Sequence, residues 1–178
     1  MSKHLISVEV ANRFGILARI AALFSAWGFN IDSLAVGETE DPTVSRMTLV
    51  VPGDDQIIEQ VIKQLRKLID VIKVTDLTAE SVVERELVLL RVAAAGADRA
   101  EIMRVVEIFR GRIVDVHPQS LTIEITGTTD KIEGFITLLR PFGLRKLVRT
   151  GKVALAREDK SNTRMRARRR TQHPEHRG

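Results

Sequence analysis

Residues 4–27 of the chain read HLISVEVANRFGILARIAALFSAW. Apolar and polar side chains alternate over residues 4–11, and this period of two predicts a strand. Over residues 15–27 the apolar side chains recur every three or four positions, which predicts a helix with one buried face. Gly28 follows as a glycine typical of a helix end. The chain therefore opens with a strand, a short loop and a helix.

The same kinds of element continue and then repeat. In the first half we expect strands at 30–37, 44–51 and 70–77, with a helix that Asp54 or Asp55 caps and that carries apolar side chains over 57–68. In the second half we expect strands at 85–94, 112–116 and 121–126, a helix capped by Asp98 and closed by Gly111, a helix at 130–139, and a last strand within 144–156. Two consecutive βαββαβ units predict an α+β fold, in which each antiparallel sheet carries both helices on one face.

A short polar connection at residues 78–83 separates the two units. We expect a first domain over residues 1–78, a second over 79–157, and a basic flexible tail over 158–178. A unit of roughly 75 residues buries only about 60–65% of the surface that its unfolded chain exposes and is marginal alone. One sheet face and the edge strands should stay open, and open edges invite pairing. We therefore expect a twofold homodimer.

The composition of the 178 residues, 44% hydrophobic and 29% charged, is that of a globular protein. Cysteine is absent, which excludes disulfides and thiolate chemistry and fits a reducing, cytoplasmic setting. No apolar run is long enough to span a bilayer, so a membrane partner is not expected. The first residues lack the charged and apolar leader of a signal peptide.

The net charge of +5 belongs to the end of the chain. From residue 157 onward there are eight basic and three acidic residues, so the preceding body is neutral. The RNA recognition module shares the βαββαβ order, but it stacks bases on aromatic side chains of its central strands. Residues 4–8 and 44–51 contain no aromatic residue. The sequence therefore predicts no specific nucleic-acid partner.

No catalytic or metal-binding constellation is recognisable. His4 begins a strand and His117 precedes a proline, and both are interpreted as structural or exposed. His173 and His176 lie in the tail, without a rigid scaffold for a metal. Nucleophile, zinc and nucleotide-binding motifs are absent. We therefore expect no catalytic residue, no metal and no cofactor bound by this chain.

One local feature indicates a small ligand. Asn12 and Gly15 join the first strand to the first helix, where a glycine permits close approach and unpaired amides favour an anion such as a carboxylate. Asn30, just past the helix, offers a second amide group. The alternative is that Asn12 only caps the turn and Gly15 only permits it. Residues 95–100 lack the Asn-x-x-Gly pattern, which places any ligand in the first half.

Several segments resemble a known family. Residues 12–20 (NRFGILARI) and 28–34 (GFNIDSL) resemble the ACT domain, a small-molecule sensing module. The regulatory (small) subunits of acetolactate synthase, also called acetohydroxyacid synthase, show a closer similarity, which extends to EDPTVSRMT at 40–48, VEREL at 83–87, EIFRG at 107–111, IVDV at 113–116 and RTG at 149–151.

This resemblance implies an N-terminal ACT domain followed by a ferredoxin-like domain, in a dimer that activates a separate catalytic subunit. That subunit uses thiamine diphosphate, magnesium and usually FAD to condense pyruvate in branched-chain amino-acid biosynthesis. Valine bound between two ACT domains gives feedback inhibition. On these grounds the effector-binding residues are Asn12, Gly15, Ile16, Leu17, Asn30 and Ile31.

In this interpretation the amides after Gly15 take the valine carboxylate. Asn30, of this or a partner chain, holds its polar groups. Ile16, Leu17 and Ile31 line its isopropyl group. The alternative function is a stand-alone ACT-type sensor of another amino acid that regulates a different partner.

Overall fold

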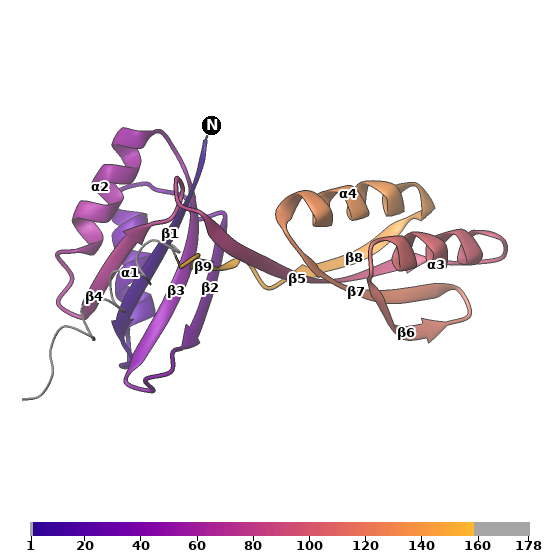
Figure 1. Cartoon of the computed structure of the whole chain (residues 1–178), viewed down its shortest axis with the longest axis horizontal. Coiled ribbons are helices and arrows are strands. Elements are labelled where there is room, and N and C mark those ends of the chain that lie inside the picture. Colours follow the sequence, from indigo (N-terminus) through magenta and orange to yellow (C-terminus); the bar gives the residue numbers. More distant parts are fainter. Residues whose placement is uncertain (1, 159–178) are drawn as a thin grey trace, which may run out of the picture.

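The computed structural model describes residues 2–158 of the chain, which form two lobes joined by a long strand and by the segment that returns beside it (Figure 1). The elements of the first lobe are β1 (Lys3–Ala11), α1 (Ile16–Ala26), β2 (Ser33–Glu38), β3 (Val44–Pro52), α2 (Asp55–Leu65) and β4 (Val71–Asp76). Its strands are all antiparallel, in the order β2-β3-β1-β4. The two helices cover one face of this sheet.

The second lobe repeats this arrangement. Its elements are β5 (Val82–Ala93), α3 (Asp98–Ile108), β6 (Arg112–His117), β7 (Ser120–Gly127), α4 (Thr129–Leu139), a 3₁₀ turn (Arg140–Phe142), β8 (Leu144–Arg149) and β9 (Val153–Ala156). The strand order β6-β7-β5-β8 matches that of the first lobe. The predicted α+β fold with two βαββαβ units is therefore confirmed. No described helix is long and apolar enough to cross a bilayer.

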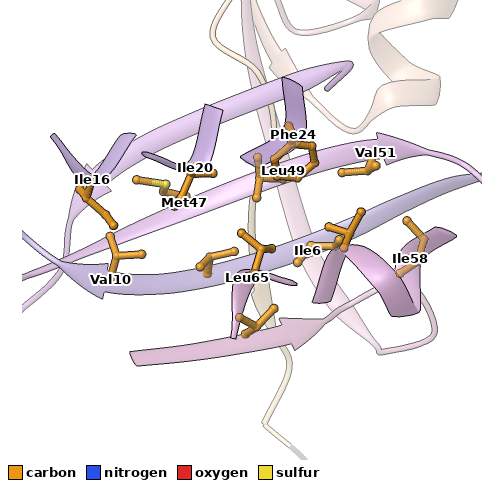
Figure 2. Close-up of a cluster of buried hydrophobic side chains, with 13 residues drawn as sticks. Ile6, Val10, Ile16, Ile20, Phe24, Met47, Leu49, Val51, Ile58 and Leu65 are labelled. Carbon is orange, nitrogen blue, oxygen red and sulfur yellow. The ribbon is translucent and has the colours of Figure 1, made fainter. Parts of the chain in front are cut away.

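Each lobe has its own hydrophobic core between helices and sheet. In the first, alternate side chains of β1 and β3 meet the apolar faces of α1 and α2 (Figure 2). Ile6, Leu49 and Phe24 are among its most deeply buried members. In the second, Leu90 of β5, Ile123 of β7 and Phe135 of α4 are among the most deeply buried members. The cores are separate clusters, so the cohesion of each lobe comes mainly from its own sheet and helices.

Of the two predicted aspartate caps, one is confirmed and one is wrong. Asp54 does cap α2, because its Oδ1 accepts a hydrogen bond from the Ile57 amide at 2.9 Å. Asp98, however, is the first residue of α3 rather than its cap, which is Ala97. Its carboxylate still lies in the first turn, where the helix dipole favours negative charge.

The end of α3 is also different from the prediction. The left-handed residue after this helix is Arg110, with φ 55°, and not Gly111. Gly111 instead lies in a crowded place, where an added Cβ would be 3.3 Å from both the Glu124 carbonyl oxygen and Val106 Cγ1. Gly28 behaves as predicted after α1, with φ 68°.

The expected last strand is divided in two. Gly151, with φ 84°, breaks the chain direction between β8 and β9. Strand β9 then pairs with the first residues of β5, from Val82↔Ala156 to Arg85↔Val153. We call this two-stranded segment, residues 82–85 and 153–156, the ribbon.

The ribbon corrects the expectation that one face of the first sheet stays open. Ala154 and Val82 pack on Leu5, Val50 and Leu77, which lie on the sheet face away from the helices. The contact begins beside β2, where the Lys152 amide donates to Ser33 Oγ at 3.0 Å. The second half of the chain therefore covers part of the first sheet.

Candidate effector-binding site

Gly15 is the N-cap of α1 and adopts a left-handed conformation with φ 82°. A Cβ added at this position would meet no atom within 4 Å, so the space beside its backbone is open. Within residues 2–158 no side chain caps this end of α1. The first amides of a helix have no acceptor inside the helix, so those after Gly15 are available to an anion.

Asn12 connects the loop between β1 and α1 to the turn between β2 and β3. Its Nδ2 donates to Glu38 Oε1 at 3.0 Å and to the Pro42 carbonyl at 2.9 Å. Its backbone amide donates to the Thr43 carbonyl at 2.7 Å. Asn12 therefore fixes the turn between β2 and β3, and not the turn before α1 that the alternative interpretation named. Within residues 2–158 its side-chain oxygen Oδ1 is left as an acceptor.

The turn that Asn12 contacts is itself well ordered by hydrogen bonds. The hydroxyl and the amide of Thr43 both donate to Asp41 Oδ1, at 2.7 and 2.9 Å. These bonds hold the pKa of the Asp41 carboxyl below its ordinary value, with the hydroxyl as the larger cause. An aspartate is already ionised at neutral pH, and these hydrogen bonds hold its negative charge at a fixed place in the turn.

The three predicted apolar residues have different surroundings. Ile16 is 6% exposed and belongs to the first core, so the expectation that its side chain lines a ligand is corrected. Only its backbone amide can contact a ligand. Leu17 is 44% exposed on the surface of α1, and Ile31 is half-buried against the core. Phe14, beside Gly15, has a fully exposed ring.

Asn30 lies at the other end of α1 from Asn12 and Gly15. The 11 residues of this helix separate the two ends by roughly 16 Å at 1.5 Å per residue. Asn30 also lies before β2, because this strand begins at Ser33 and not at residue 30 as predicted. The Nδ2 of Asn30 donates to Asp32 Oδ1 at 3.0 Å. A single chain therefore does not bring all the predicted residues to one ligand.

The histidines of the described residues form no catalytic relay. His4 is buried, and its Nε2 lies 3.2 Å from Ser2 Oγ and 3.9 Å from Asp55 Oδ1. A Ser-His-Asp relay needs both ring nitrogens, and here both neighbours share one. His117 is exposed, and its Nδ1 accepts from the Gln119 amide. Within residues 2–158 no group of three or more potential ligands could hold a metal ion, and the tail histidines lie outside these residues.

The fold and the uncapped glycine at the start of α1 are those of an ACT domain, the class of module that senses small molecules. Residues 6–73 match the family described as "AHAS small subunit-like ACT domain". Residues 85–158 match the family described as "Small subunit of acetolactate synthase".

Similar proteins extend this match over most of the chain. The acetolactate synthase small subunit of Aquifex aeolicus is 55% identical over 157 residues, which cover 88% of this chain and 82% of that protein. A probable acetolactate synthase small subunit of Archaeoglobus fulgidus is 56% identical, over 89% of this chain and 99% of that one. The crystal structure of the small subunit from Thermotoga maritima is 45% identical, covers 89% and 99% of the two chains, and superposes with a TM-score of 0.81. The chain belongs to the acetolactate synthase small subunit family.

Sequence reasoning missed the contact between the two halves of the chain. Ser33 accepts the Lys152 amide, and a Cβ on Gly151 would lie 2.8 Å from Ser33 Oγ and 3.0 Å from the Leu34 carbonyl oxygen. The available signal was the glycine of the RTG segment at 149–151, because a glycine inside a strand pattern indicates a break or a close backbone approach.

Proposed function

We propose that this chain is a noncatalytic regulatory subunit that activates a separate acetolactate synthase catalytic subunit and confers feedback inhibition by valine. Membership of the small subunit family supports the regulatory role. Thiamine diphosphate, magnesium and FAD belong to the catalytic partner, which performs the condensation of pyruvate as a transferase. Both subunits work in the cytoplasm.

The observation that carries the valine proposal is the uncapped end of α1 at Gly15. The valine carboxylate accepts hydrogen bonds from the amides of Ile16 and Leu17, and the helix dipole favours its negative charge. Asn12 Oδ1 accepts from the ammonium group. The exposed side of Leu17 contacts the isopropyl group.

The remaining part of the site comes from a second copy of the chain. Asn30 and Ile31 lie at the far end of α1, so an antiparallel arrangement of two α1 helices brings them to the Gly15 end of the partner helix. Each twofold dimer then has two equivalent sites. The exposed Phe14 and Leu17 fit this arrangement, because large apolar side chains gathered on a surface mark contact sites.

Valine regulates by binding one arrangement of the two ACT domains better than another. A coupling free energy of about 1–3 kcal/mol between the valine site and the catalytic subunit is sufficient for allosteric control. The ribbon contact at Ser33 supplies a structural route from the start of β2 to the second lobe.

Reconstitution tests the proposed function. We expect the purified chain to form no acetolactate from pyruvate, to stimulate the catalytic subunit severalfold when added to it, and to make the mixture sensitive to valine. Acetolactate formation measured for each subunit and for the mixture checks this. Stimulation without valine sensitivity would remove the effector proposal, and copurification with a different partner would favour a stand-alone sensor.

A further inference from the structure

A groove of about 490 Å³ lies between the first sheet and the ribbon. Its floor is formed by β2 and by Arg46 and Thr48 of β3, and its wall by the outward side chains of the ribbon. Val83, Val153 and Leu155 on this wall are all substantially exposed. Apolar side chains gathered beside a groove indicate a contact surface.

The groove combines parts of two segments to which the function proposed above assigns no ligand or partner contact. Glu40 and Arg46 belong to the EDPTVSRMT segment, and Val83 and Arg85 to the VEREL segment. About 40 positions separate these segments in the chain, and the ribbon brings them together by packing on the first sheet.

One rim of the groove is the free edge of β2. This strand ends the order β2-β3-β1-β4, so its outer edge is unpaired within the described lobe, and Val36 on it is 47% exposed. A second copy can add its own β2 antiparallel to this edge. The six residues of β2 are far fewer than the roughly 20–30 residues per side of a stable interface. The interface must therefore extend beyond the strand, and the groove is continuous with its edge.

The groove carries two residues of opposite charge, Arg85 and Glu40, that form no ion pair within residues 2–158. Arg85 is paired in register with Val153, next to Lys152, which contacts Ser33 at the start of β2. Within residues 2–158 the guanidinium of Arg85 donates only to the carbonyl of the neighbouring Glu84. Glu40 follows the other end of β2 and makes no ion pair within those residues.

Antiparallel pairing of two β2 strands places the end of one beside the start of the other. Glu40 of the second copy then faces Arg85, and twofold symmetry repeats the pair. We propose that the groove is part of the homodimer interface, so that the ribbon and the ACT domain of one copy together receive the β2–β3 turn of the other. This inference rests on the homodimer of the proposed function and adds to it a reciprocal Arg85–Glu40 ion pair.

Charge reversal in the full-length chain tests the inference. We expect Arg85→Glu and Glu40→Arg each to raise the dimer dissociation constant about tenfold or more, because like charges then face each other twice per dimer. The double variant should return to within about threefold of the unmodified chain, since it restores opposite charges. Sedimentation equilibrium measures all three constants. Arg104→Glu, an exposed charge reversal on α3, is the matched control and should change nothing.

A second variant tests the existence of the homodimer separately from the Arg85–Glu40 contact. Val36→Lys puts a charge on the β2 edge and should dissociate the dimer. If Val36→Lys dissociates it while the charge reversals have no effect, the dimer stands and the groove contact is wrong. If the unmodified chain is a monomer at every concentration measured, the proposed homodimer and the groove contact are both wrong. Weakening by the single reversals without rescue in the double variant would also overturn the Arg85–Glu40 pair.

Discussion

Valine inhibition of the reconstituted enzyme should weaken by about 100-fold or more when Gly15 is replaced by aspartate. The added carboxylate would lie beside the amides that take the valine carboxylate, and like charges at such a distance cost several kcal/mol, where each 1.4 kcal/mol is a factor of ten. The open space beside Gly15 means that the new side chain displaces no neighbour. Activation of the catalytic subunit should therefore survive, and inhibition curves with and without the variant measure the change.

Gly96→Asp is the matched control for this experiment. Gly96 lies in the corresponding loop of the second lobe, has a left-handed φ of 57°, and also has no atom within 4 Å of an added Cβ. Both variants therefore add the same charge and a similar backbone strain. Normal valine inhibition in Gly15→Asp, or equal loss in Gly96→Asp, would contradict the proposed site.

Replacing Phe135 by alanine should destabilise the second lobe by about 3–5 kcal/mol, because it removes a fully buried ring from a packed core. Phe135 lies on α4, and its ring centroid is 5.3 Å from that of Phe109. Hydrogen exchange of amides in β5 and β7 measures the change. Because the two cores are separate, slow exchange in β1 and β3 and the affinity for valine should be retained.

Leu138→Ala on the same helix is the control for Phe135→Ala. Leu138 is half-exposed, so its truncation should cost much less. Equal loss of protection in both lobes of Phe135→Ala would show that the lobes unfold as one unit, and the separation inferred from the two cores would be wrong.

The regular elements could be predicted because their signals are local. The alternation in β1 and the helical spacing in α1 each identify a buried face, and Ile6 and Phe24 are indeed buried. The repeat of the whole pattern then predicted the second lobe. Local propensity and burial agree in these segments, so their sequence alone is sufficient.

Features that depend on distant parts of the chain could not be predicted. The pairing of β9 with β5 joins residues about 70 positions apart, and no local pattern near Val153 indicates it. The spacing in α1 places Ile16 on the same face as Ile20 and Phe24, and this face is buried. The role of Ile16 as a ligand contact came from the family resemblance and not from the spacing. The close approach of Gly111 to the Glu124 carbonyl oxygen of β7 likewise joins residues that are distant in the chain.

Only the part of the candidate site that lies within one loop could be predicted. Gly15 and Asn12 lie in one loop, so their proximity follows from the sequence. The bonds from Asn12 to Glu38 and Pro42 require the turn between β2 and β3, which is distant in the chain. The separation of Asn30 from Gly15 along α1 is what requires a second copy.

A mixed dimer tests most directly whether the valine site is shared between two chains. Asn30→Ala and Gly15→Asp homodimers should each bind valine weakly or not at all. A mixed dimer of the two, isolated with two different affinity tags, has one site with both changes and one intact site. Calorimetric titration should therefore give about one valine per mixed dimer, with the affinity of the unmodified protein. No binding to the mixed dimer, or normal binding by either homodimer, would contradict the shared site.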